Sequence, residues 1–210
     1  MTEYYVPTGA GESEYAEKRS RFLGHVRLVE SEDEARAFVA EMKKKYYDAR
    51  HNCFAYIVRD GGVVRYGDDG EPQGTAGQPI LAVLNGAELT NVCCTVTRYF
   101  GGVLLGTGGL VRAYTAAAKA ALENAGICRM ARWQSFRIPC PYPMYERVRR
   151  LLEEREAVVA STDYGADVSI AVFVRADRAE AFEEALRELS AGGIVPEKTG
   201  ERFRGVRIEP

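Results

Sequence analysis

Hydrophobic positions in the first third of the chain change from a strand period to a helix period and back. Residues 22–29 alternate as a strand does, and Ser31 with Glu34 then forms the capping box of a helix. The apolar stripe of that helix consists of Ala35, Phe38, Val39, Met42 and Tyr46. Strand patterns return at residues 53–59 and 63–66, and the Asp-Gly-Gly turn at 60–62 predicts that they form a hairpin.

The middle of the chain continues this mixture of strands and helices. Thr75 is placed to cap a short helix over residues 76–84, and the apolar run 92–96 predicts a strand. A longer helix follows, with a stripe of Leu110, Tyr114, Ala117, Ala118 and Ala121. The sequence at 124–126 then indicates a helix stop.

The last eighty residues have a different and regular order of elements. From Trp133 onward the pattern predicts strand, helix, strand, strand, helix, strand, over residues 135–139, 145–155, 157–164, 167–175, 178–190 and 200–208. This is the βαββαβ order of a split βαβ fold. We therefore expect an α+β protein with two domains, residues 1–130 and 131–210.

Two glycine-dense loops bracket the short helix and the strand at 92–96. Glycine reaches positive φ without steric cost and leaves main-chain N–H groups uncovered. The second loop, RYFGGVLLGTGGLVRAY, contains Gly101, Gly102, Gly106, Gly108 and Gly109 ahead of a helix start. Such a loop can cradle an anion, with Arg98 and Arg112 completing the site, or can serve turns and close packing. It contains neither a P-loop nor a G-x-G-x-x-G spacing.

The first loop, DDGEPQGTAG, carries clustered carboxylates. Asp68, Asp69 and Glu71 lie within four residues and are followed by Gly74, Thr75 and Gly77. Carboxylates in such a cluster can bind a hard cation, or they can simply turn the chain. The spacing differs from that of a calcium loop, so we expect no metal and no cofactor.

Three further groups near these loops could carry chemistry. His51, beside Asn52, could act as a general base with a loop carboxylate, or could be a structural histidine at a strand edge. Cys53 is expected to face the core. Tyr99 and Phe100 could stack on a base, although core packing is the favoured interpretation for large aromatic side chains.

Composition favours a reduced cytoplasmic protein. The five cysteines show no C-x-x-C spacing, and the start of the chain resembles no secretion signal. No apolar run is long enough to span a bilayer, so no membrane association is expected. The formal net charge is −2 and is spread evenly over both predicted domains, so neither half is a strongly basic nucleic-acid module.

Four motifs together resemble the IMPACT/YigZ family: SRFLGHV, RHNCFAY, DDGEPQGTAGQPIL and VTRYFGGVLLGTGGLVRAY. The resemblance implies an N-terminal ribosomal protein S5 domain-2-like domain and a C-terminal ferredoxin-like domain. It also implies a link to translation, because eukaryotic IMPACT proteins compete for a ribosome-associated activator of the kinase that acts on initiation factor two. Many relatives have lysine where this chain has Leu104.

We therefore expect a binding protein that regulates translation through protein or RNA contacts, with the ribosome, translation factors or RNA as partners. The binding residues are expected to be His51, Asn52, Asp68, Asp69, Glu71, Gly74, Thr75, Gly77, Arg98, Tyr99, Gly101, Gly102, Gly106, Gly108, Gly109 and Arg112. The alternatives are a hydrolase or phosphoryl-transfer enzyme and a nucleotide sensor without turnover. In both alternatives the loops would hold phosphate or another anionic small molecule.

Overall fold

The computed structural model describes residues 3–207 and shows a mixed α+β protein with two antiparallel sheets. The chain divides into two compact units. The N-terminal unit comprises Tyr4–Arg129 with residues 205–207, and the C-terminal unit comprises Glu3 with Met130–Arg204. Within residues 3–207 there are five α-helices, and none of them is long and apolar enough to cross a membrane.

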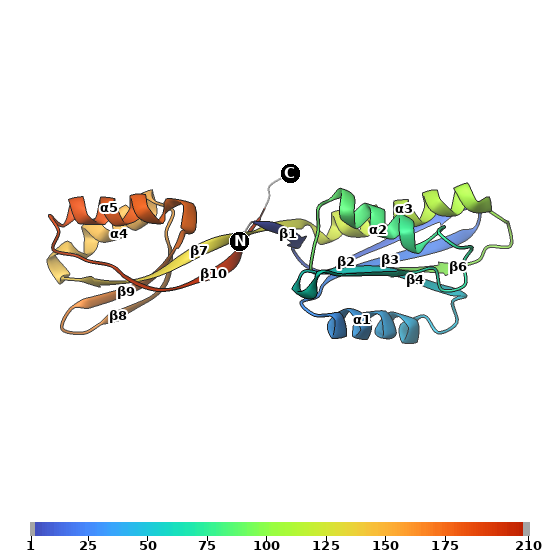
Figure 1. The fold of residues 1–210 in the computed structure, drawn as a ribbon, viewed down its shortest axis with the longest axis horizontal. Helices are drawn as coiled ribbons and strands as arrows, with labels where there is room; N and C mark the ends of the chain where they lie inside the picture. Colours follow the sequence, from blue (N-terminus) through green and yellow to red (C-terminus); the bar gives the residue numbers. More distant parts are fainter. Residues whose placement is uncertain (1–2, 208–210) are drawn as a thin grey trace. The chain divides into compact units, whose positions relative to one another are not determined.

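The N-terminal unit has three layers, with helices on both faces of a five-stranded sheet (Figure 1). The strand order is β2-β3-β6-β4-β5. The strands are β2 (Gly11–Glu17), β3 (Ser20–Leu28), β4 (His51–Val58), β5 (Val63–Gly67) and β6 (Val92–Tyr99). Helix α1 (Glu32–Lys45) covers one face, and α2 (Gly77–Gly86) and α3 (Gly106–Ala125) cover the other.

Local sequence signals predicted much of this unit. The Ser31 hydroxyl accepts the N–H of Glu34, as the capping pattern predicts for α1. Strands β4 and β5 form the predicted hairpin, with Val58 opposite Val63. The pattern missed β2 and the short strand β1 (Tyr4–Pro7), which precede the first predicted strand.

The central sheet separates two hydrophobic clusters. Cys94 belongs to the cluster beneath α2 and α3, whereas its neighbour Cys93 belongs to the cluster beneath α1. The two adjacent cysteines therefore point to opposite faces of one strand. Helix α3 lies very close to the sheet at Gly24, where an added Cβ would stand 2.6 Å from the carbonyl oxygen of Ala117.

The C-terminal unit contains the predicted succession of strand, helix, strand, strand, helix and strand. The elements are β7 (Ile127–Cys140), α4 (Tyr145–Glu154), β8 (Val158–Tyr164), β9 (Val168–Arg175), α5 (Ala179–Leu189) and β10 (Glu197–Arg207). The sheet order is β1-β7-β9-β8, and β10 also pairs with β7. Strand β7 is longer than predicted and continuous from Ile127, and Ile208 of the predicted last strand lies outside the described residues.

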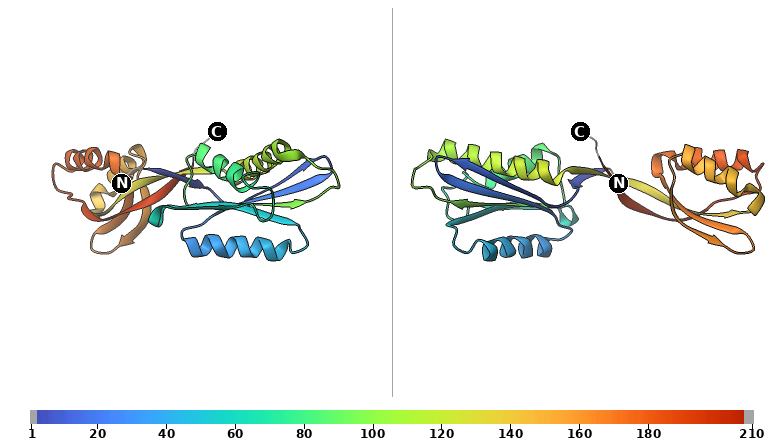
Figure 2. Two further views of the ribbon diagram at one scale, coloured as in Figure 1. Left: turned by 45° about the vertical axis from the view of Figure 1, so that its right-hand side comes forward. Right: turned by 180° about the vertical axis from the view of Figure 1, so that it is seen from behind.

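Side chains of β9 alternate strictly between buried and half-buried. The buried ones pack with α4 and α5. Both helices lie on one face of the sheet, as the ribbon views of Figure 2 show. The opposite face of this sheet carries no helix (Figure 1).

Candidate functional site

Glu71, in the loop after β5, is the centre of a buried hydrogen-bonded cluster. Its Oε1 atom accepts a bond of 2.7 Å from Nη1 of Arg98 and one of 2.8 Å from the Tyr114 hydroxyl. The Glu71 and Arg98 side chains are only 3% and 6% exposed. One carboxylate oxygen therefore joins the first glycine loop to β6 and to α3.

Strand pairing brings His51 to the same cluster. His51 on β4 lies opposite Arg98 on β6, and its Nε2 atom is 3.9 Å from Oε1 of Glu71. Its Nδ1 atom lies 2.9 Å from the carbonyl oxygen of Asp69. Because a carbonyl oxygen can only accept, Nδ1 of His51 is the donor in this bond, and Nε2 is the ring nitrogen that faces the carboxylate.

Asp68 serves the start of helix α2. Its carboxylate accepts the backbone N–H groups of Gly74, Ala76 and Gly77 at 2.8 to 3.1 Å. The prediction that Thr75 caps this helix is wrong, because the Thr75 hydroxyl donates to the carbonyl of Pro72 instead. Asp68 satisfies the free N–H groups of the first turn and places a negative charge at the positive end of the helix dipole.

Asp69 contacts both the start of β4 and the end of α1. Its Oδ2 atom accepts the backbone N–H of Asn52, and its Oδ1 atom lies 2.7 Å from Nζ of Lys43. The amide oxygen of Asn52 in turn accepts the Thr97 hydroxyl. The three carboxylates therefore have separate protein partners, and in residues 3–207 no group of three or more His, Cys, Asp and Glu could hold a metal ion.

Cys53 completes the buried cluster, and it is fully buried as predicted. Its thiol lies 2.9 Å from the carbonyl oxygen of Asp68 and 3.4 Å from the hydroxyl of Tyr114. Burial raises the pKa of the Cys53 thiol, and burial followed by the neighbouring thiol raises the pKa of Tyr114. Both groups are held protonated, so neither is an activated nucleophile.

The second glycine loop is shorter than its glycine spacing suggests. Gly106, Gly108 and Gly109 lie in the first turn of α3, which corrects the prediction that they belong to the loop. Gly102 and Gly106 have φ of 83° and 71°, values that favour glycine. Gly101 packs against backbone, since an added Cβ would stand 2.1 Å from the carbonyl carbon of Arg19.

The same loop presents an exposed apolar surface. Phe100, Val103 and Leu104 are 43%, 42% and 83% exposed. The expectation that Phe100 packs in the core is therefore wrong. Tyr99 is half-buried, and its hydroxyl donates to Asp48. We call residues 100–104 the exposed loop.

The structure brings together only part of the predicted binding set. His51, Asp69, Glu71 and Arg98 converge, whereas within residues 3–207 no hydrogen bond or ion pair joins the exposed side chain of Arg112 to Glu71. The sequence could not reveal Tyr114 as a member, because a tyrosine at a helix-stripe position is indistinguishable from a core residue.

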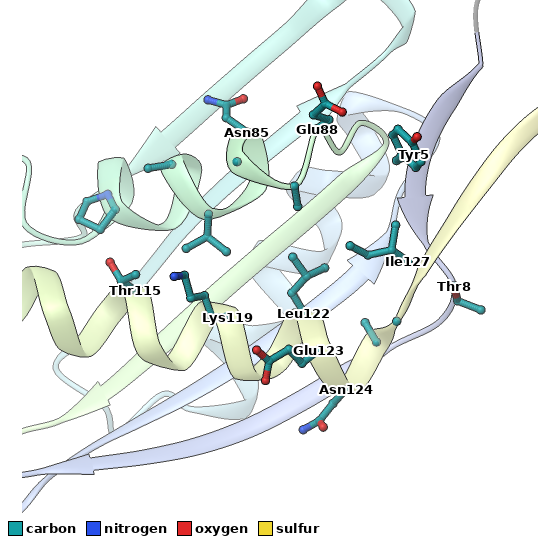
Figure 3. A pocket seen from close by; sticks show the side chains of 17 residues that line it. Tyr5, Thr8, Asn85, Glu88, Thr115, Lys119, Leu122, Glu123, Asn124 and Ile127 are labelled. Carbon is teal, nitrogen blue, oxygen red and sulfur yellow. The ribbon is translucent and has the colours of Figure 1, made fainter. Parts of the chain in front are cut away.

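A separate groove of about 1340 Å³ lies between α2 and α3 (Figure 3). Figure 3 shows Lys119 and Glu123 on α3, and Asn85 and Glu88 at the end of α2, along this groove. None of the predicted binding residues lines it. Its walls combine aliphatic surface with both signs of charge, which identifies no single class of ligand.

Comparisons with known proteins identify the family. Residues 18–122 match the Impact N-terminal domain, and residues 138–192 match a domain of unknown function, DUF1949. The IMPACT family member YvyE of Bacillus subtilis is 35% identical over 193 residues, which cover 91% of this chain and 89% of YvyE. The chain belongs to the IMPACT family.

Similarity within the IMPACT family extends to eukaryotes and to solved structures. A protein IMPACT homolog of Dictyostelium discoideum is 36% identical over 106 residues, covering 48% of this chain and 30% of that protein. A crystal structure described as that of a hypothetical protein is 31% identical, with a TM-score of 0.60 over 95% of this chain and 98% of the other. All residues of the buried cluster lie within the Impact N-terminal match.

Proposed function

We propose that this protein is a cytoplasmic binding protein that regulates translation through contacts with protein or RNA. The observation that carries the proposal is that the ionisable groups around Glu71 are hydrogen-bonded to one another inside the protein. Glu71, Arg98 and Tyr114 are buried and bonded inside the unit. The guanidinium of Arg98 also lies 5.5 Å from the ring centre of Phe100, in the loop that exposes Phe100 and Leu104. This arrangement supports a rigid surface for recognition.

The alternative of a hydrolase or phosphoryl-transfer enzyme has less support. Such an enzyme needs an accessible nucleophile or a base that can reach substrate. Asp68 and Asp69 are bonded to backbone N–H groups, and burial keeps the Cys53 thiol protonated. A phosphate-binding loop would also draw on Arg98, whose Nη1 already pairs with Glu71.

We also propose a specific fold for each of the two units. The order β10-β7-β9-β8 with two helices on one face supports a ferredoxin-like C-terminal unit. An S5 domain-2-like fold for the N-terminal unit rests on the family resemblance.

The test is capture of partners on the immobilised protein at low salt, from ribosomes, purified translation factors and total RNA. We expect the wild-type chain to retain at least one of these. Leu104→Asp should lose retention of ribosomes or translation factors, because charge at this exposed apolar position opposes docking. Val195→Asp is the matched control, since Val195 is 73% exposed but lies in the other unit. Absence of all three partners from the wild-type capture refutes the proposal.

A further inference from the structure

The face of the C-terminal sheet that carries no helix gathers aromatic and cationic side chains. Ser135 on β7 pairs with Phe173 on β9, and the neighbouring Phe136 and Val172 point instead into the core beneath α4 and α5. By strand alternation, Trp133 lies on the same face as Ser135 and Phe173. We call this surface the open face. In Figures 1 and 2 it is the side of the sheet opposite α4 and α5.

Two arginines of β10 lie over the aromatic rings of the open face. The Cζ atom of Arg202 is 3.5 Å from the ring centre of Phe173, and that of Arg204 is 4.7 Å from it. Arg204 is also 5.5 Å from the ring centre of Trp133. Ser135 lies on β7, which is between β10 and β9 in the sheet. Its small side chain leaves room for the arginines of β10 to extend over the ring of Phe173.

These two arginines lack the carboxylate partners that their neighbours have. Arg132 pairs with Glu201, Arg137 with Glu197 and Arg175 with Asp177. For the described part of the chain, no carboxylate lies within ion-pair distance of Arg202 or Arg204. Two like charges on one ring repel each other, so this arrangement attracts an anion.

Buried donors on the open face also lack acceptors. Nε1 of Trp133 and Nη1 of Arg204 are shielded from solvent, and within residues 3–207 neither has a hydrogen-bond partner. Trp133 is only 8% exposed, yet it belongs to none of the three hydrophobic clusters. An unsatisfied buried N–H is unfavourable, so a ligand that brings an acceptor has a site prepared for it.

A hollow lies directly beside these groups. It has a volume of about 370 Å³, and the residues that line it are Ser135, Phe136, Ala171, Val172, Phe173, Thr199, Gly200, Glu201 and Arg202. It therefore combines aromatic surface, two hydroxyl groups, the Arg202 cation and the carboxylate of Glu201, which is paired with Arg132 at 3.5 Å.

We propose that the open face binds single-stranded RNA. A base stacks on Phe173 in place of the Arg202 guanidinium, and Arg202 and Arg204 then contact the phosphates beside that base. Trp133 donates its Nε1–H to an oxygen of the bound strand. RNA fits better than an acidic peptide, because a carboxylate would neutralise the arginines but leave the aromatic surface unused, whereas every base has a π face.

This inference rests on the RNA part of the proposed function and deepens it. It assigns a site in the other unit and uses none of the residues around Glu71. It would hold even if the protein did not bind ribosomes or translation factors.

Trp133 is the only tryptophan of the chain, so its fluorescence reports on the open face alone. The experiment titrates the full chain with a short oligouridylate, following Trp133 emission and the anisotropy of a labelled copy of the same RNA. We expect saturable quenching with wild-type protein. Phe173→Leu should weaken binding by at least about fivefold, because stacking of one base is worth about 1–3 kcal/mol.

The charge contribution is tested separately by salt. For RNA binding, the logarithm of the association constant falls as the logarithm of the salt concentration rises. The double variant Arg202→Gln, Arg204→Gln should make this slope less steep by about 1.4, since each phosphate contact to a single strand contributes about 0.7. Arg150→Gln is the matched control, because Arg150 is an exposed arginine of α4 on the covered side of the sheet, and it should leave both slope and affinity unchanged.

Three results would overturn the proposal. The first is absence of quenching at any RNA concentration. The second is equal affinity of the wild type, Phe173→Leu and the double-arginine variant when their far-ultraviolet circular dichroism shows that all three are folded. The third is quenching by oligoglutamate or inorganic phosphate as strong as that by RNA, since either would show an anion site that does not recognise bases.

Discussion

The guanidinium of Arg98 and the carboxylate of Glu71 meet at 2.7 Å in the interior of the N-terminal unit, although the two residues belong to different elements. Glu71 lies in a loop, and Arg98 lies near the end of β6. Their contact holds the first glycine loop against the strand that leads into the second. The exposed loop at residues 100–104 thereby starts from a fixed point.

Removal of either partner of this pair is expected to destabilise the protein. Glu71→Ala and Arg98→Ala should each lower the free energy of unfolding by about 3–5 kcal/mol, because each leaves an unpaired buried charge. Urea denaturation at neutral pH measures the effect. The double variant should lose less than the sum of the two single losses.

The matched control is the exposed pair of Arg21 and Glu14, whose side chains are 55% and 53% exposed. Arg21→Ala should cost less than about 1 kcal/mol. A loss from Arg98→Ala as small as that from Arg21→Ala would contradict the structural role of the buried pair.

Asp68, rather than Thr75, should control the stability of α2. Asp68→Ala removes the acceptor of three backbone N–H groups and should lower the free energy of unfolding by about 1–2 kcal/mol. Thr75→Ala removes only a bond to the Pro72 carbonyl and should cost less. If chemical denaturation ranked the two variants in the opposite order, Thr75 would be the cap after all.

Gly101 should not tolerate a side chain. In Gly101→Ala the new Cβ would meet the backbone of Arg19 at 2.1 Å, so β3 or the exposed loop would have to move. We expect a marked fall in melting temperature. Gly86→Ala is the control, since nothing lies within 4 Å of its Cβ position and it should leave the melting temperature unchanged or raise it.

His25 should make stability depend on pH in mildly acidic solution. Burial, and then the charge of Lys45, lower the pKa of His25 from 6.5, and its Nε2 contacts the Tyr46 hydroxyl. The unfolded chain therefore takes up the proton at higher pH than the folded chain does. Stability is complete above about pH 6.5 and falls as the pH drops through the interval down to the lowered pKa.

The test compares wild type and His25→Gln in urea at pH 8 and at several values below 6.5. The variant loses some stability at pH 8, but the part of the acid-dependent loss that belongs to His25 should disappear. Parallel stability curves for the two proteins over this range would show that His25 does not contribute.

Elements that depend on a few neighbouring residues could be predicted from the sequence. Hydrogen bonds between polar groups far apart in the sequence could not. The α1 cap and the β4–β5 hairpin need only a few adjacent residues, so the sequence predicted both. Strand β2 was missed because GESEYAE is an edge strand with mostly polar side chains and no apolar run. The Asp68 cap was missed because the carboxylate reaches N–H groups six to nine residues further on.

The candidate site shows the same division. Glu71 and Arg98 were both among the predicted binding residues, and the structure brings them together. The motifs could not show that Tyr114 and Cys53 complete the cluster, because this depends on how α3 packs over β4. Nor could they show Trp133, Phe173 and two arginines together, since these residues come from three strands far apart in the sequence.

The most direct test of the translation role is co-sedimentation of the purified protein with purified ribosomes at low salt. Applied to ribosomes, the proposal predicts that wild-type protein pellets with them, that Leu104→Asp remains in the supernatant, and that Val195→Asp behaves as wild type. Wild-type protein that stays in the supernatant, or equal pelleting of both variants, would contradict ribosome binding through the exposed loop.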